Sequence, residues 1–307
     1  MQFSIARRIL SAGLALWGVT TVVFVLLRVL PGDPVLTLLA GSGASEAAIA
    51  QARVQMGLDA PLPVQYARYL WNASHGDFGR SLFSNRPVIL TIGEQLPATL
   101  ELAGAALLIT ISAGLGLGIL TALRPGSWFD RLCTASAVLG MSVPIFWSGL
   151  LLIWLFSATL DWLPATGAGG WQHLVLPAAL LGFAGVGPLV RLVRANILAI
   201  LEAPYITVAR GKGLSDATVI RRHALRNAII PAINLIGLQA GFLLGGTVVT
   251  ETVFARPGLG RVVVDAIVWK DLPVVQAAVL LIATTYVGIN LVVDLLSVAL
   301  DPRVRQA

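Results

Sequence analysis

The sequence has few of the residues that build metal or thiol sites. Its 307 residues include one cysteine, Cys133, and three histidines. A single cysteine excludes a disulfide framework and a thiolate metal cluster within the chain. The histidines His75, His173 and His223 fall in three separate segments, so their spacing indicates no ligand cluster. We therefore expect this chain to bind no metal ion.

Charged residues are scarce as well. They make up 12% of the chain, whereas hydrophobic residues make up 57% and the mean hydropathy is +0.85. A soluble domain carries about 25% charged residues. The composition therefore predicts a multi-pass membrane protein. The net charge of +6 indicates basic loops beside apolar segments and no nucleic-acid partner.

The chain also lacks the short motifs of common enzymes. No segment has the GxxxxGK[ST] pattern of a phosphate-binding loop, and Gly211-Lys212-Gly213 lacks the preceding glycine. Neither the HExxH motif of zinc proteases nor the GxSxG motif of serine hydrolases occurs. We expect no catalytic residues, no cofactor and no ATP bound by this chain.

Six apolar stretches are present, and a membrane-spanning helix needs about 20 such residues. The first follows Arg7 and Arg8, so a cleavable signal peptide is the alternative; its length and the turn at Pro31-Gly32-Asp33-Pro34 favour a span. The sequence thus predicts an all-α membrane protein with a single transmembrane domain over residues 1–307. The predicted spans are 9–30, 97–123, 132–160, 174–190, 228–250 and 274–300.

The distribution of Lys and Arg predicts the orientation. The short loop 161–173 has neither residue and carries Trp162 and Trp171, as expected outside the cytoplasm near a membrane interface. Both termini are then cytoplasmic. Residues 31–96 form a long periplasmic loop, with helices expected near Ser45–Met56 and Pro63–Ala73.

The cytoplasmic loop 191–227 holds seven Lys and Arg residues against two acidic ones. Residues 202–210 suit a short helix, the run Gly211-Lys212-Gly213 breaks it, and Ser215 can N-cap a second helix from Asp216. Such a hairpin could dock on a soluble partner or rest on anionic membrane lipid. Spacing alone favours neither.

Four stretches carry a family resemblance across nearly the whole chain. They are Leu30-Pro31-Gly32-Asp33-Pro34, the run from Thr207 to Ser215 with His223 to Ala228, the run from Glu251 to Gly260, and the run from Asn290 to Arg303. In this order they resemble the dipeptide, oligopeptide and nickel permease family of ABC importers. Two departures are Thr207-Val208-Ala209 in place of a Glu-Ala-Ala triplet, and Gly211 where alanine is common.

The resemblance implies a type I ABC importer permease in the bacterial inner membrane, with a cytoplasmic coupling helix. The implied partners are a second related permease, two cytoplasmic ATPase subunits that hold ATP and Mg, and a periplasmic substrate-binding protein. Replacement of Gly213 should then uncouple ATP hydrolysis from uptake. The residues implied for ATPase coupling are Arg210, Gly211, Lys212, Gly213, Leu214, Ser215, Arg221 and Arg222.

The same resemblance implies transport of dipeptides or oligopeptides, with nickel, a nickel chelate or glutathione as alternatives. A stand-alone channel or ion-coupled carrier is the alternative of another class. Such proteins place charges or interrupted helices at the membrane midplane. The predicted spans are nearly free of charge at mid-length, which favours the importer.

Glycines recur at every fourth residue in the fifth predicted span, at Gly237, Gly241 and Gly245. This spacing is typical of close helix packing. The resemblance adds a second interpretation, a smooth wall of the translocation pathway, and suggests Glu251 at the outer end as a pathway residue. For Gly114 and Gly118 in the second span we expect packing alone.

Overall fold

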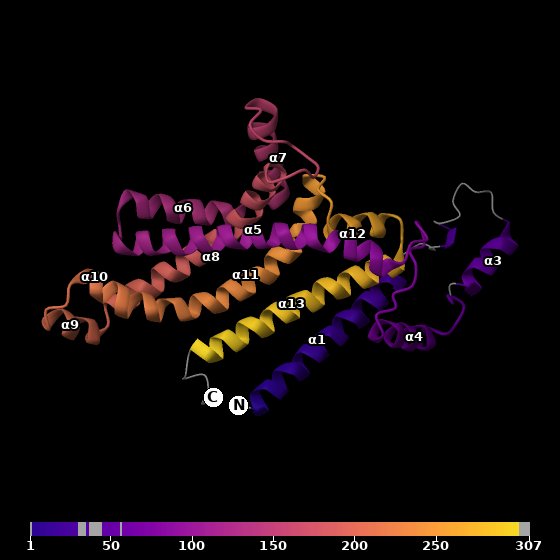
Figure 1. Ribbon diagram of the computed structural model, residues 1–307, viewed down its shortest axis with the longest axis horizontal. Helices are drawn as coiled ribbons and strands as arrows, with labels where there is room; N and C mark the ends of the chain where they lie inside the picture. The colour runs from indigo at the N-terminus through magenta and orange to yellow at the C-terminus, as the bar shows by residue number, and fades with distance from the viewer. Residues whose placement is uncertain (1, 30–34, 37–44, 56, 301–307) are drawn as a thin grey trace. The chain divides into compact units, whose positions relative to one another are not determined.

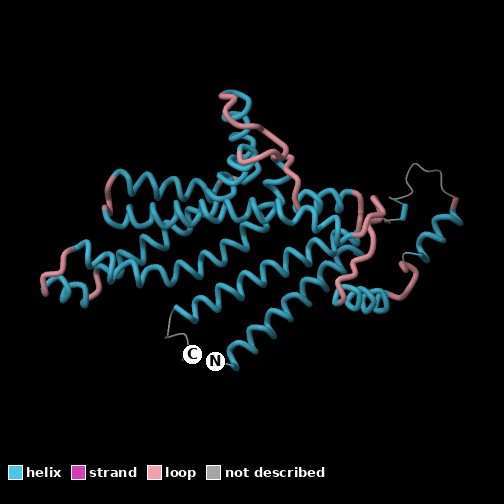
Figure 2. The backbone as a smooth tube through the Cα atoms, viewed as in Figure 1, coloured by secondary structure: helices cyan, strands magenta, loops and turns pink. Residues whose placement is uncertain are grey.

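The computed structural model describes residues 2–29, 35–36, 45–55 and 57–300. Within this part of the chain the backbone consists of helices joined by loops, and the only strand-like feature is one antiparallel bridge between Arg80 and Pro87 (Figure 2). The prediction of an all-α fold is confirmed.

The helices are α1 Gln2–Val29, α3 Glu46–Gln55, α4 Leu62–Ser74, α5 Val88–Leu123, α6 Trp128–Ser142, α7 Ile145–Leu152, α8 Gln172–Leu201, α9 Pro204–Gly211, α10 Asp216–Val219, α11 Leu225–Val253, α12 Leu259–Val268 and α13 Leu272–Leu300, with π-helical segments η1 Ile153–Thr159 and η2 Ile220–Ala224.

Among the described residues, five helices are long and apolar enough to cross a membrane. They contain the segments Arg8–Val29, Val88–Leu123, Gln172–Leu201, Asn227–Val253 and Leu272–Val293. Each overlaps one predicted span. The helices extend further than predicted, since α8 continues through residues 191–201, which the sequence analysis assigned to the cytoplasmic loop.

The predicted span 132–160 is not one straight helix. It consists of α6 and the continuous segment α7–η1, which meet at an angle of 109°. The break lies at Val143-Pro144, where Val143 is extended and Pro144 has no backbone N–H to continue the helix. Counted as one span, the pair brings the total to six.

Many apolar side chains of the spans are exposed in the isolated chain. In α1, Leu10, Leu14 and Trp17 are each more than half exposed. A soluble protein would not present such a surface on a 22-residue apolar segment. The surface is suited to lipid and to other membrane helices.

The chain divides into two compact units. One consists of Leu100–Arg256 and the chain from Gly288 onward, and is called here the 100–256 unit. The other consists of Gln2–Thr99 and Pro257–Val287, and is called the 2–99 unit.

Helix α8 is the central element of the 100–256 unit and packs against α5, α6, α7 and α11 (Figure 1). Close approach to α5 depends on glycine. A Cβ at Gly114 would lie 2.6 Å from Leu189 Cδ2, and one at Gly118 would lie 2.8 Å from Val193 Cβ. The packing expected for these two glycines is confirmed.

The 2–99 unit has an apolar core between the start of α5, α12 and the start of α13, built around Val88, Leu259 and Val275. A polar cluster joins its two chain segments. The Asp271 carboxylate accepts hydrogen bonds from Ser81 Oγ at 2.5 Å and from the Leu82 N–H at 3.1 Å. Both Ser81 and Asp271 are buried.

The helices expected in the long loop are present as α3 and α4, except that Met56 lies outside the described residues. Helix α12 was not predicted. Its ten residues are too few to form a span, and they lie between the predicted spans 228–250 and 274–300.

Candidate functional site

The basic hairpin after α8 has the predicted helix–glycine–helix form. Helix α9 starts at Pro204, a residue suited to the first helical position. At its other end Gly213 has φ +83°, the left-handed conformation that favours glycine. The Gly213 N–H donates to the Arg210 carbonyl at 2.9 Å and the Leu214 N–H to the Ala209 carbonyl at 3.3 Å. These two bonds form a Schellman motif, which ends the helix sharply.

The second helix begins as predicted. Ser215 Oγ accepts a hydrogen bond from the Thr218 N–H at 3.4 Å, and Ser215 and Thr218 hydroxyls are 2.9 Å apart. Ser215 therefore N-caps α10. The chain then continues through η2 directly into α11. The hairpin is thus joined to α8 through Glu202 and Ala203 and to α11 without an intervening loop.

A small apolar core holds the hairpin onto the end of α8. Ile206 and Val219 are fully buried, and Ala209 is nearly so. They pack with Ile200 and Leu201 of α8. The hairpin is thus a packed element.

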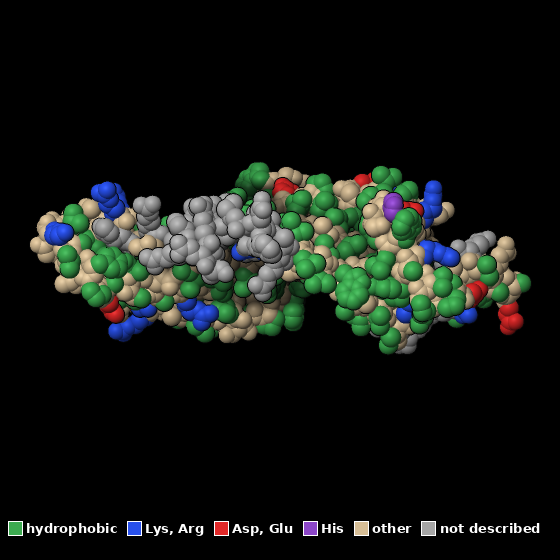
Figure 3. Space-filling model, turned by 90° about the horizontal axis from the view of Figure 1, so that it is seen from below, with side chains coloured by type: hydrophobic (Ala, Val, Ile, Leu, Met, Phe, Trp, Pro, Cys, Tyr) green, Lys and Arg blue, Asp and Glu red, His purple; other side chains and the backbone are tan. Residues whose placement is uncertain are grey.

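The other side of the hairpin is exposed and basic. Leu214 is 40% exposed, and Arg210, Lys212, Arg221 and Arg222 are exposed around it. Several Lys and Arg side chains are visible on the end of the 100–256 unit that carries α9 and α10 (Figure 3). The arrangement suits docking into an acidic surface with an apolar pocket.

An ion pair fixes the adjoining helices. Arg194 of α8 donates from Nε to Asp130 Oδ1 at 2.6 Å and from a terminal nitrogen to Oδ2 at 2.7 Å. The Gly126 N–H also donates to this carboxylate at 2.9 Å. Sequence analysis missed the pair, because its members are 64 residues apart and neither belongs to a local motif.

The glycines of α11 do not share one environment. A Cβ at Gly237 would lie 2.5 Å from Val293 Cγ1, so this glycine packs against α13. At Gly245 an added Cβ would meet nothing within 4 Å. Gly241 is half-buried. Packing is therefore confirmed at Gly237, whereas Gly245 lies beside open space in the isolated chain.

Glu251 is fully buried at the end of α11. Its carbonyl accepts the Arg256 N–H at 2.9 Å. The buried Arg256 side chain forms an ion pair of 2.5 Å with Glu101 of α5, which is 57% exposed. Arg256 was not recognised from the sequence, since it follows the apolar run and lies in a turn.

The described residues contain no group of three or more His, Cys, Asp or Glu side chains that could hold a metal ion. The chemistry available in the hairpin is charge complementarity, apolar contact and mechanical linkage to α8 and α11.

Comparison with known proteins identifies the class. Residues 114–306 match the family described as "Binding-protein-dependent transport system inner membrane component", and residues 1–103 match its N-terminal family, "Binding-prot-dependent transport system membrane comp, N-term". The chain belongs to this family. It is an integral inner-membrane permease of an ABC importer, as the resemblance implied, and the family requires a binding protein and an ATPase as partners.

Relatives of similar length match the permease from end to end. It is 42% identical over 313 residues to a Brucella abortus (strain 2308) protein named "Putative peptide transport system permease protein", with 99% of both chains covered. It is 43% identical over 301 residues to the glutathione transport system permease protein of Escherichia coli (strain K12), with 98% of both chains covered.

Solved structures support the fold. A chain of the inward-facing MetNI methionine ABC transporter aligns with a TM-score of 0.60 at 18% identity, over 70% of the permease and 99% of that chain. A chain of an amino acid ABC transporter gives a TM-score of 0.52, over 71% and 94%. The ABC importer permease fold expected from the sequence is therefore confirmed.

Proposed function

We propose that the permease forms half of the pore of an ABC importer for peptides, with glutathione as the second candidate solute. The observation that carries the proposal is the end-to-end identity of 42–43% to permeases named for peptide and glutathione transport. Glutathione is itself a tripeptide, so both candidates present amide bonds and carboxylates. The second permease and two ATPase subunits complete the proposed assembly.

The hairpin α9–α10 is the proposed ATPase contact. Its exposed turn from Gly213 to Ser215 would enter a groove of the ATPase, and the four basic residues named above would lie at the rim. The packed contact with α8 and the direct continuation into α11 support the idea that motion of the hairpin moves both helices.

The pathway residues proposed in α11 are Gly241 and Gly245, whereas Gly237 has a packing role. Glu251, which the resemblance suggested as a pathway residue, is fully buried within the chain and is not proposed to contact solute. Nickel as a free ion is the weaker candidate, since the described residues offer no multidentate ligand group. A chelated nickel ion needs no such group and is kept as an arm of the test.

The test is purification through a tag on this chain, followed by reconstitution in proteoliposomes with the co-purifying subunits and the binding protein. ATP-dependent uptake is measured with labelled dipeptides, a labelled pentapeptide, labelled glutathione and a Ni(II) chelate. Uptake of a peptide or glutathione that requires ATP and the binding protein is the expected result. Uptake by the chain alone, without ATP, would instead indicate a channel or carrier.

A further inference from the structure

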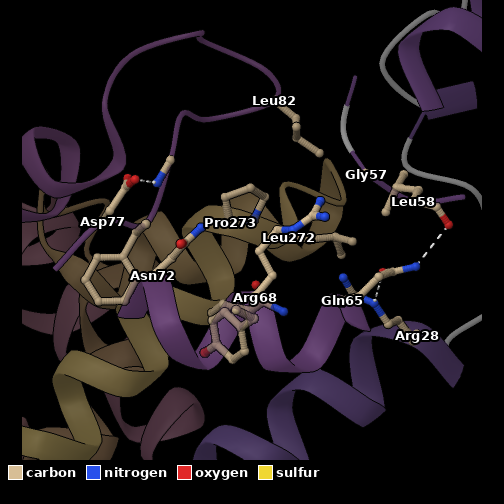
Figure 4. Close-up of a pocket in the computed structure, with 14 residues that line it drawn as sticks. Arg28, Gly57, Leu58, Gln65, Arg68, Asn72, Asp77, Leu82, Leu272 and Pro273 are labelled. Carbon is tan, nitrogen blue, oxygen red and sulfur yellow. Dashed lines mark hydrogen bonds between the residues drawn. The ribbon is translucent and has the colours of Figure 1, made fainter. Parts of the chain in front are cut away.

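The 2–99 unit contains a cavity of about 250 Å³ that the transport mechanism above does not use. Its walls come from the outer end of α1, from α4, from the loop after α4 and from the first turns of α13 (Figure 4). The polar side chains among the lining residues are Arg28, Gln65, Arg68, Tyr69, Asn72, Asp77 and Gln276.

Three of these side chains bury a polar atom that has no hydrogen-bond partner among the described residues. The atoms are one terminal guanidinium nitrogen of Arg28, the Tyr69 hydroxyl and Gln276 Nε2. Gln276 is only 7% exposed. Buried polar groups in folded proteins are nearly always paired with protein, water or ligand, so three such groups around one cavity favour a polar occupant.

All three atoms can donate a hydrogen bond. The Arg28 and Gln276 nitrogens are donors only. Burial, with a smaller contribution from Tyr66, raises the pKa of Tyr69 to about 12, so its hydroxyl keeps its proton at neutral pH. The polar occupant is therefore an acceptor.

The Arg28 guanidinium is held in place by its neighbours. Its Nε donates to Gln65 Oε1 at 3.0 Å, and Gln65 in turn donates to the Leu58 carbonyl at 3.0 Å (Figure 4). The guanidinium carbon lies 4.0 Å from the centre of the Phe24 ring. No carboxylate among the described residues forms an ion pair with it, and an oriented guanidinium is the group best suited to bind an oxyanion.

The balance of charge around the cavity is positive. Arg68 adds a second guanidinium, and the single carboxylate is Asp77. Asp77 is exposed, and its Oδ1 already accepts the Gly79 N–H at 2.9 Å. The single negative charge of the exposed Asp77 does not neutralise the two positive charges of Arg28 and Arg68.

We propose that this cavity is a binding site for an oxyanion, a carboxylate or a phosphate group, held by Arg28, Tyr69 and Gln276. Its volume suits the anionic end of a molecule. The group could belong to a soluble solute or to a phospholipid headgroup beside the outer end of α1. The proposal does not rest on the identity of the transported solute, because binding is measured without transport.

The test uses the full transporter purified through a tag on this chain. In delipidated dodecyl maltoside micelles, which contain no phosphate, binding of N-acetylalanine is compared with binding of N-acetylalanine amide, which lacks the carboxylate. In a second arm phosphatidylglycerol is added stepwise, and retained lipid is counted by native mass spectrometry. Selective binding of the acid indicates a soluble carboxylate. Retention of phosphatidylglycerol that excludes the acid indicates a lipid phosphate.

Two variants and one control separate binding from folding. Arg28→Gln should weaken the occupant about tenfold or more. Gln276→Met removes an unpaired buried donor, so it should also weaken binding while thermal stability stays the same or rises. Arg86→Gln, an exposed charge of the same unit outside the cavity, should change neither. The proposal is overturned if acid and amide bind equally, if neither arm shows retention, or if Gln276→Met leaves retention unchanged.

Discussion

Arg194 and Asp130 form a bidentate ion pair that links the start of α6 to α8, with N–O distances of 2.6 and 2.7 Å. The Asp130 side chain is 5% exposed and that of Arg194 is 30% exposed. Helix α8 continues from Arg194 to the hairpin α9–α10. The pair therefore braces the helix that is proposed to receive the motion of the ATPase.

Asp130→Asn should lower the stability of the purified permease by about 2 kcal/mol, because Arg194 then lacks its carboxylate. The measurement is thermal unfolding in detergent. The matched control is Glu94→Gln, which breaks the Arg86–Glu94 pair, in which both side chains are 52% exposed. Exposed pairs contribute little, so this control should unfold at nearly the same temperature as the parent protein. Equal losses in the two variants would show that the Asp130 pair is not a brace.

The contact between α5 and α8 predicts that the same substitution has very different effects on stability at two neighbouring glycines. Gly118→Val would force its side chain into Val193 and should destabilise the permease by about 1–3 kcal/mol. Gly116→Val makes the same change two residues earlier, where an added Cβ meets nothing within 4 Å. It should be tolerated. Similar unfolding temperatures for the two variants would contradict the packing described here.

Gly245 provides a test of the pathway. Gly245→Leu adds bulk where the chain itself leaves open space, so the variant should fold and insert normally. If the position faces the solute path, uptake should fall at least tenfold while ATPase subunits still co-purify. Gly104→Leu is the control, since this glycine of α5 is also exposed and has no neighbour within 4 Å of an added Cβ. Full uptake by Gly245→Leu would remove the position from the pathway.

Gly213→Val tests the coupling turn. The left-handed conformation at φ +83° strains a β-branched residue, and the Schellman turn that presents Leu214 should be lost. We expect ATP hydrolysis to continue without uptake, and membrane insertion to remain intact. Gly76→Val imposes the same strain at φ +74° in the loop after α4, outside the predicted contact and with no neighbour within 4 Å of an added Cβ. Uncoupling by Gly76→Val as well would point to a general effect of strain.

Local sequence patterns were sufficient for much of this fold. Long apolar runs predicted the spans, because the hydrocarbon thickness sets a helix length that few soluble segments reach. The turn at Gly213 and the cap at Ser215 were predictable, since both depend on the conformational preferences of single residues. The bend at Pro144 also depends on the conformational preference of a single residue and was predictable in the same way. Its angle of 109° was not predictable from the sequence.

The polar contacts that join distant segments could not be predicted in this way. Asp130–Arg194, Glu101–Arg256 and Ser81–Asp271 link residues 64, 155 and 190 positions apart. No local sequence pattern around one residue of such a pair identifies the other residue. The same holds for the cavity lined by Arg28 and Gln276, because it exists only once α1, α4 and α13 have come together.

The 2–99 unit is assembled from two stretches of chain, Gln2–Thr99 and Pro257–Val287. During synthesis its first stretch emerges long before the second, with Leu100–Arg256 made in between. At about 5–20 residues per second this interval lasts roughly 10 to 30 s. Until Asp271 is made, the donors Ser81 Oγ and Leu82 N–H lack the carboxylate that accepts their hydrogen bonds. The apolar core around Val88 lacks the residues that α12 and α13 contribute. The earliest part of the chain is thus completed only near the end of synthesis, and it stays open to proteases and chaperones until then.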